Sequence, residues 1–515
     1  MTASTAPQSS AEQPTIVQEM GTAVRHTAVY GLGNILLKAV GFVMVPFYTH
    51  YLSPAEYGIL EILDLSMSLF GMFLAIGMIS AMLRAYAAAE SEEQRRSVIS
   101  TSFIFVSCAG IGVYVLLGGL VRPVSTWLLG PQIPAKYLLI SFSTFILGYI
   151  LNVPRTYLRA RESSGAFVAV DSLGVVAMLV LVVVFIVIFK MGLLGILISS
   201  LIVAAGQLSV LTFWMLRHLE VRFDRGVLWK MLVFGFPLMF SNMALFVLNF
   251  SDRFFLQHLR SLEVVGVYAV GYKFGYMLNY LLVQPFLVMW QGRMYVVHRN
   301  PDHENVFGQM FVLYSLLLTY AGLGLAVLSP EIVRFMVGAR FAGSQDVIPV
   351  VGFAYVFFGI AYFAQTGMYV TERTRLVGGV SAAAAILNLG LNFVLIRQFG
   401  MMGAAWATLL SFLAIAAGSY AASQRVLPLA LGGGRVAAAL ITAAGLYGLC
   451  RFFAPHALVT ALLFKAVVLS AFPVLVWKTG ILSGREIETI RSAWSQLAGK
   501  CRTFSRPPAR GVESI

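Results

Sequence analysis

Long apolar stretches alternate with short polar connections along almost the whole chain. Fourteen stretches of roughly twenty residues can be marked, at about residues 29–49, 59–82, 98–119, 134–154, 166–188, 191–216, 228–251, 264–289, 306–328, 347–370, 376–396, 401–423, 434–453 and 457–477. About 20 helical residues cross a hydrocarbon core about 30 Å thick, so each stretch is long enough to span a bilayer. The pattern therefore predicts an all-α integral membrane protein with about 14 transmembrane helices.

The composition and the distribution of charge agree with this picture. Hydrophobic residues make up 59% of the chain and charged residues only 11%, whereas about a quarter of a soluble protein is charged. With the N-terminus in the cytoplasm, about two thirds of the 36 lysines and arginines fall on the cytoplasmic side of the spans. We therefore expect a multi-pass protein of the inner (plasma) membrane with both termini cytoplasmic. The net charge of +14 is an orientation signal, and no nucleic-acid partner is expected.

An internal repeat divides the spans into two sets of six. The segment 190–195 matches 398–403, and 57–59 matches 265–267, both at an offset of 208 residues. Six spans are an even number, so both copies enter the membrane in the same orientation. A parallel repeat predicts two six-helix bundles with a cleft between them, plus two extra C-terminal helices. A scaffold enlarged by duplication is the alternative.

The repeat suggests how the chain is organised. We expect a disordered N-terminus over 1–20, an N-terminal lobe over 21–220 and a C-terminal lobe over 221–425. Transmembrane helices 13 and 14 occupy 426–480, and an amphipathic helix and tail occupy 481–515. Ser483 and Glu486 have the spacing of a capping box that opens this last helix. It is expected to lie on the cytoplasmic leaflet, with a partner-binding helix as the alternative.

Three charged residues lie deep within predicted spans. Lys38 is in the first span, Asp64 in the second and Lys273 in the eighth. Charges at such depth are costly and usually face a bundle interior or a water-filled cavity. One interpretation places both lysines in the cleft, to receive an anionic substrate group, with Asp64 as a partner or proton site. The other makes them a buried ion-pair network.

Polar and aromatic residues gather on the seventh and eighth spans. The tyrosines of the eighth span recur every four residues and so share one helix face. Such a row suits a carbohydrate path, and ordinary aromatic packing is the alternative. The candidate substrate-binding residues besides the three charges are Tyr272, Tyr276, Tyr280, Asn242, Asn249 and Gln284.

Four further residues are candidates for gating. Pro237 and Pro285 lack the backbone N–H that a helix uses and are candidate hinges in the seventh and eighth spans. Asp252 and Arg253 end the seventh span as a structural cap or an outer gate.

The sequence lacks the motifs that are typical of several other functional classes. It has no glycine-rich phosphate loop with Lys and Ser or Thr, so the chain itself is not expected to be an ATP-driven pump. We predict no catalytic residue, no metal ligand and no cofactor, and therefore no enzyme. A secondary transporter that works by alternating access of two lobes remains.

Three segments resemble a known family. Residues 51–58, Tyr-Leu-Ser-Pro-Ala-Glu-Tyr-Gly, resemble the Leu-x-Pro-x-Glu-Tyr-Gly signature of Wzx-type polysaccharide flippases. The Phe-Gly-Phe-Pro of 234–237, followed by Ser-Asp-Arg-Phe-Phe-Leu at 251–256, is similar to the same group. The opening of span eight at 265–268, with Trp290 closing it, completes the resemblance. These flippases belong to the multidrug/oligosaccharidyl-lipid/polysaccharide exporter superfamily.

The resemblance implies a substrate and partners. It implies flipping of an undecaprenyl-pyrophosphate-linked oligosaccharide (O-antigen or exopolysaccharide repeat unit) from the cytoplasmic to the periplasmic leaflet. The implied partners are this lipid-linked oligosaccharide, membrane lipids, and a polysaccharide polymerase or glycosyltransferase. A lipid II flippase and a multidrug cation antiporter are the alternatives within the superfamily. The former tends to carry several arginines in its first spans, where this chain has only Lys38 before Arg84.

Overall fold

All regular structure in the described part of the chain is helical, as predicted. The computed structural model describes residues 44–491, apart from 76, 162, 218, 220, 221, 456, 485, 489 and 490 and the side chains of 75, 164 and 237–245. Contacts between Cα atoms divide the chain into unit 1, Met1–Met243, and unit 2, Ala244–Ile515. The division falls within one helix, α9 (Arg225–Leu259). The predicted domain limits remain predictions.

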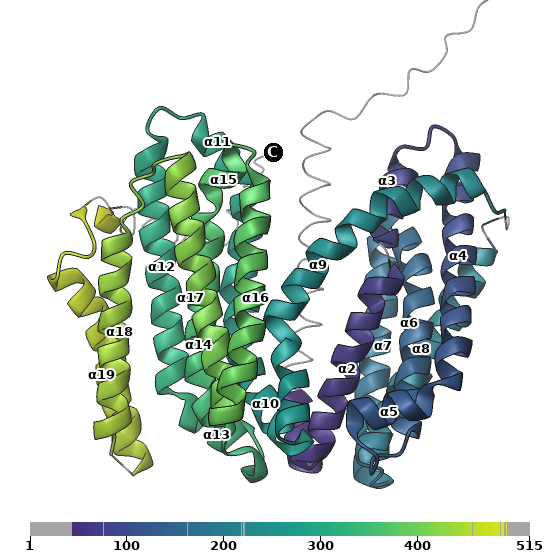
Figure 1. Ribbon diagram of the computed structural model, residues 1–515, viewed down its shortest axis with the longest axis horizontal. Coiled ribbons are helices and arrows are strands. Elements are labelled where there is room, and N and C mark those ends of the chain that lie inside the picture. The colour runs from purple at the N-terminus through teal and green to yellow at the C-terminus, as the bar shows by residue number, and fades with distance from the viewer. Residues whose placement is uncertain are drawn as a thin grey trace, which may run out of the picture. The chain divides into compact units, whose positions relative to one another are not determined.

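Unit 1 is a bundle built around α6. Its helices before α9 are α2 (Pro54–Ala75), α3 (Met78–Ala87), α4 (Glu92–Gly119), α5 (Val121–Leu129), α6 (Lys136–Ala160), α7 (Ser164–Val183) with the π turn η1 (Val184–Ile188), and α8 (Leu193–Leu216). Helix α6 packs against α2, α4 and α8 (Figure 1). Leu151, Leu158 and Leu211 form an apolar cluster where α6 meets α8. The predicted second span is two helices here, because Gly77 between them has a φ of 61°, which ends a right-handed helix.

Unit 2 is a larger bundle around α14. After α9 come α10 (Leu262–Leu278), the π turn η2 (Asn279–Val283), α11 (Gln284–His298), α12 (His303–Val327), α13 (Ser329–Met336), the 3₁₀ turn η3 (Ala339–Phe341), α14 (Ser344–Ala364), α15 (Thr366–Val370), α16 (Thr374–Phe399), α17 (Met401–Val426), α18 (Gly433–Phe453) and α19 (Leu458–Lys478). Helix α14 contacts α10, α12 and α17, and α18 packs against α12 and α19 (Figure 1).

Most of the predicted spans coincide with helices. Among the described residues, 11 helices are long and apolar enough to cross a membrane. The predicted seventh and eighth spans are also helical, in α9 and in α10 to α11. Residues 29–43 of the first predicted span lie outside the described residues. The chain is thus a multi-pass membrane protein. The described helices account for fewer spans than the fourteen that were predicted.

The internal repeat appears as matching helix caps in the two halves. Gly192 caps α8 with φ 55° and ψ −134°, and Gly400 caps α17 with φ 58° and ψ −130°. The hydroxyl of Ser53 accepts from Glu56 N at the start of α2, at 3.2 Å, and Ser261 accepts from Val264 N at the start of α10, at 3.3 Å. Both pairs keep the offset of 208 residues.

Two glycines allow α10 to approach α14 closely. A Cβ atom at Gly271 would lie 2.7 Å from the backbone oxygen of Ser344, and one at Gly275 would lie 2.6 Å from Val351 Cγ1. Small residues four apart are a common device for close helix packing in membranes. This contact packs α10 against α14. The membrane span Ser344–Val370, which α14 begins, is deeply buried, with 78% of its apolar stretch inside the protein.

Candidate functional site

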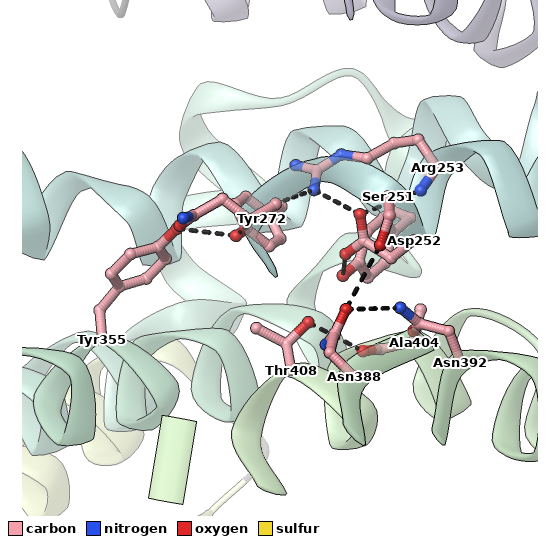
Figure 2. A network of polar contacts seen from close by, with 11 residues as sticks. Ser251, Asp252, Arg253, Tyr272, Tyr355, Asn388, Asn392, Ala404 and Thr408 are labelled. Carbon is pink, nitrogen blue, oxygen red and sulfur yellow. Dashed lines mark hydrogen bonds and ion pairs between the residues drawn. The ribbon is translucent and has the colours of Figure 1, made fainter. Parts of the chain in front are cut away.

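A buried ion pair lies at the centre of a polar network in unit 2 (Figure 2). Asp252 and Arg253 are neighbours on α9, with 2% and 1% of their surfaces exposed. Arg253 Nη1 donates to Asp252 Oδ1 at 2.7 Å, and the backbone N–H of Arg253 donates to the same oxygen at 2.9 Å. Burying an ion costs several kcal/mol unless it is paired and hydrogen-bonded. The two charges therefore keep each other stable inside the bundle.

Further groups on α9 and α10 complete the surroundings of both ions. Arg253 Nη1 also donates to the carbonyl oxygen of Asn249 at 2.9 Å, one helical turn earlier. The guanidinium lies over the ring of Tyr272, with Cζ 3.7 Å from the ring centroid. Tyr268, one turn before Tyr272, donates its hydroxyl to Asp252 Oδ2. Cation–π contact and charge-assisted hydrogen bonds thus compensate for the water that both ions lack.

A pair of tyrosines extends the network from α10 to α14. The Tyr272 hydroxyl donates to the carbonyl oxygen of Asn249 at 2.8 Å and lies 2.7 Å from the Tyr355 hydroxyl. Tyr355 in turn donates to Asn249 Oδ1 at 2.9 Å. All three residues are buried. The close approach that Gly271 and Gly275 permit brings the α10 tyrosines within reach of α14.

An asparagine pair extends the network in the other direction, to α16 and α17. Ser251 Oγ on α9 donates to Asn388 Oδ1 at 3.3 Å, and Asn392 Nδ2 donates to the same oxygen at 2.9 Å. Asn388 Nδ2 donates to Ser411 Oγ on α17 at 3.2 Å. Nearby on α17, the Thr408 hydroxyl donates to the carbonyl oxygen of Ala404 (Figure 2). The two groups of contacts meet on α9, at the adjacent residues Ser251 and Asp252, and together they involve five helices of unit 2.

This arrangement of groups holds a pair of opposite charges inside the bundle. Asp252 is the one carboxylate among the network residues described above. Replacing it with a neutral residue would leave Arg253 buried without an anion and would disturb bonds on α9 and α10 together. Among the described residues, no group of three or more His, Cys, Asp and Glu side chains is placed to hold a metal ion.

The predicted tyrosine row runs from the interior to an accessible surface. Tyr268 and Tyr272 have 0% and 1% of their surfaces exposed, Tyr276 is half-buried and Tyr280 is 38% exposed. The rings of Tyr276 and Tyr280 lie 4.6 Å apart, and those of Tyr276 and Tyr355 4.9 Å apart. Tyr268 and Tyr272 thus pack inside the bundle, whereas Tyr280 at the other end of the row is accessible.

Lys273 lies on a different face of α10 from the two packing glycines. It is two residues from each of Gly271 and Gly275, which is about 200° around the helix. Its side chain is half-buried and shares the face of Tyr276 and Tyr280, at spacings of three and seven residues. Lys273 therefore lies away from the contact with α14, next to the exposed part of the tyrosine row.

The other predicted substrate residues are dispersed. Asp64 is exposed on α2 in unit 1, and Gln284 is exposed at the start of α11. Among these remaining candidates, Asn249 belongs to the network, through both its backbone and its side-chain oxygen. Lys38 lies outside the described residues, as does the side chain of Asn242. The role of each in substrate binding stays a prediction.

The candidate gating residues differ in their surroundings. The predicted pair Asp252 and Arg253 is enclosed by α9 and α10 and forms the ion pair described above. Pro285 is exposed and is the second residue of α11, in the first turn of that helix, where its missing N–H is tolerated. Helix α9 continues through Pro237, whose side chain lies outside the described part.

Sequence reasoning missed several members of the network. Tyr355, Asn388, Asn392 and Ser411 were not among the predicted site residues. The two asparagines lie four residues apart in an apolar span, a signal that they share one helix face and point to the same neighbour. Tyr355 and Ser411 carry no such signal, because single hydroxyls are common within membrane helices.

Comparisons with known proteins agree on fold and family. The chain is similar to the lipid II flippase MurJ in an inward closed conformation, with a TM-score of 0.67, 13% identity, and coverage of 89% of this chain and 100% of that one. It is also similar to an inward-facing multidrug resistance MATE family transporter of the MOP superfamily, with a TM-score of 0.59, 12% identity, and coverage of 78% and 94%. The fold is therefore that of MOP-superfamily transporters.

Sequence similarity adds the family. A stretch of 128 residues is 28% identical to a probable low-salt glycan biosynthesis flippase of Haloferax volcanii, covering 25% of this chain and 26% of that protein. The match thus spans about a quarter of the length of that curated relative. A family model described as polysaccharide biosynthesis protein matches residues 23–289, which is about half of the chain and includes α9 and α10. The chain therefore belongs to the polysaccharide biosynthesis protein family.

Proposed function

We propose that this protein is a flippase that moves an undecaprenyl-pyrophosphate-linked oligosaccharide from the cytoplasmic to the periplasmic leaflet. The observation that carries the proposal is the family match over 23–289, since it covers the helices that hold the buried ion pair, the tyrosine row and Lys273. The similarity to a glycan biosynthesis flippase points the same way. Alternating access of two lobes is the proposed mechanism.

The physical problem for such a protein is the polar part of its substrate. A pyrophosphate and several sugar hydroxyls must pass the hydrocarbon region, where an unpaired charge costs several kcal/mol, while the polyprenyl chain stays in lipid. We propose that Lys38 and Lys273 receive the pyrophosphate. Tyr276 and Tyr280 share the helix face of Lys273 and offer ring surfaces and hydroxyls to the sugars.

The buried network has a separate role in this proposal. Its polar groups bond to one another within unit 2, so they stabilise and position α9 and α10 instead of touching sugar in the described conformation. The undecaprenyl-linked substrate and the direction of transport come from the family resemblance.

The proposal can be tested with the purified full-length chain in proteoliposomes. Wild-type protein should increase the rate at which a labelled undecaprenyl-pyrophosphate oligosaccharide becomes accessible on the opposite leaflet. Lipid II and a fluorescent organic cation serve as the competing substrates. Transport of either one, without transport of the oligosaccharide, would contradict the proposed substrate.

The same assay tests the lysine. Lys273→Ala should slow transport by about tenfold or more, because a hydrogen bond between charged groups contributes roughly 1.5–3 kcal/mol. Lys478→Ala, at an exposed helix end, is the matched control and should transport normally. Wild-type transport by Lys273→Ala would remove the lysine from the mechanism while leaving the flippase assignment intact.

A further inference from the structure

A polar cavity lies at one end of unit 2, apart from the network described above. Its volume is about 270 Å³, and it is bordered by α13, by the start of α14 and by α18 and α19. Five charged residues line it: Glu331, Arg334, Asp346, Arg451 and Lys465. Charged residues of two predicted loops thus meet here, and nothing in their spacing along the chain indicates that they belong together.

The position of the cavity is the edge of the membrane. The apolar spans of α12 and α18 end at Val327 and Phe453, and those of α14 and α19 begin at Ser344 and Leu458. The cavity touches all four of these span ends. It therefore lies at the level where lipid headgroups meet the hydrocarbon region.

The floor of the cavity is a buried ion pair. Lys465 is seven residues into α19, or about 10 Å from its start, and only 5% of it is exposed. Its Nζ donates to both carboxylate oxygens of Glu331, at 2.8 and 2.7 Å. A lysine at this depth is costly without a partner. The pair also ties α19, outside the repeat, to α13.

The mouth of the cavity carries an excess of positive charge. Arg451 pairs with Asp346 at 3.3 Å, and both are partly exposed. Arg334 is exposed and forms no ion pair with a carboxylate among the described residues. Three cations and two carboxylates leave one positive charge uncompensated, and guanidinium groups bind phosphate oxygens well.

Apolar side chains continue outward from the same helix ends. Phe452 and Phe453, next to Arg451, are 82% and 70% exposed, and Val459 and Leu463 on α19 are 69% and 64% exposed. A ligand whose anionic head enters the cavity would therefore lay its chains along an apolar surface.

We infer that this cavity is a binding site for the phosphate of an anionic phospholipid, with Arg334 and Arg451 as the groups that bind it. The inference does not depend on the proposed flippase function. In this inference, α18 and α19 help to bind a lipid headgroup beside the helices that belong to the repeat. A free phosphate would satisfy the two arginines without using the apolar surface, so the two sources can be separated.

Native mass spectrometry of the full-length protein in detergent tests this site. Phosphatidylglycerol, phosphatidylcholine and inorganic phosphate are added separately. Wild-type protein should retain phosphatidylglycerol about tenfold better than phosphatidylcholine, because only the former has a net negative charge to bind the arginines. Arg334→Ala with Arg451→Ala should remove this preference.

A matched double variant controls for net charge. Arg340→Ala with Lys478→Ala removes two exposed cations that do not line the cavity, and it should keep the preference. Gel filtration checks that both double variants are folded. An unchanged preference after loss of Arg334 and Arg451, or binding of inorganic phosphate with no lipid preference, would overturn the inference.

Discussion

At the scale of single residues, the pair Asp252 and Arg253 is the most informative feature. Both are nearly inaccessible, yet each makes hydrogen bonds to groups around it. A buried ion pair contributes little net stability compared with an apolar pair of the same shape. The loss of one partner, however, leaves the other charge uncompensated. Single and double substitutions should therefore differ sharply.

Arg253→Met should destabilise the protein by about 3–5 kcal/mol, because Asp252 would remain buried without its cation. Arg253→Met combined with Asp252→Asn should recover part of that loss. Thermal melting followed by gel filtration in detergent measures both, with Arg293→Met on the exposed face of α11 as control. Equal melting of the single and the double variant would show that the charges act independently.

At the scale of elements, the contact between α10 and α14 positions the site. Gly271 and Gly275 bring the two backbones together, which places Tyr272 beside Tyr355 and the ion pair. Small side chains on one face of α10 thereby determine the polar contacts on a neighbouring face.

Gly275→Ala should cost roughly 1–3 kcal/mol, because the new methyl group would overlap Val351 and approach the backbone nitrogen of Gly352 to 3.0 Å. The same thermal measurement applies. Gly292→Ala on α11 is a suitable control, since nothing lies within 4 Å of its Cβ position. A Gly275→Ala protein that melts with the wild type would mean that α10 and α14 can separate at no cost.

Hydrophobic pattern predicted these elements well, and the site only in part. Most span limits lie within a few residues of the observed helices, because a membrane demands long apolar stretches with every backbone group bonded. At the predicted capping box, the structure shows the half that Glu486 supplies: its carboxylate accepts from the backbone N–H and the hydroxyl of Ser483. The break at Gly77 was missed, since an apolar run does not reveal a left-handed residue.

The network itself needed three-dimensional information. Asp252, Arg253, Asn249 and Tyr272 stand out in sequence. Nothing in it shows that Tyr355, 106 positions after Asn249, or Asn388, 137 positions after Ser251, forms hydrogen bonds with this part of α9. The charged cavity was missed for the same reason. Glu331 and Lys465 are separated by 134 positions along the chain, and only the packing of α13 and α19 makes them partners.

At the scale of the whole molecule, the repeat is visible in backbone conformation. Gly192 and Gly400 share a conformation that residues with a Cβ atom rarely adopt, and each caps an equivalent helix in its own unit. Duplication thus preserved a backbone requirement while the surrounding side chains diverged.

Substitution of either glycine should therefore have similar consequences. Gly192→Ala and Gly400→Ala are each expected to cost about 1–3 kcal/mol through backbone strain. Gly378→Ala, on α16 with open space around it, is the control. The melting temperatures of the three variants test this prediction. If only one of the two cap variants melted at the wild-type temperature, the two halves would no longer share this requirement.

The graded burial of the tyrosines on α10 gives the protein a set of internal reporters. Tyr280 is accessible, Tyr276 less so, and Tyr272 and Tyr268 are enclosed. Each lies about 6 Å further along the helix than the last. If water entered the bundle from the open end during a working cycle, phenol rings would become reactive in order of position. The deepest tyrosine that reacts would then show how far the bundle had opened.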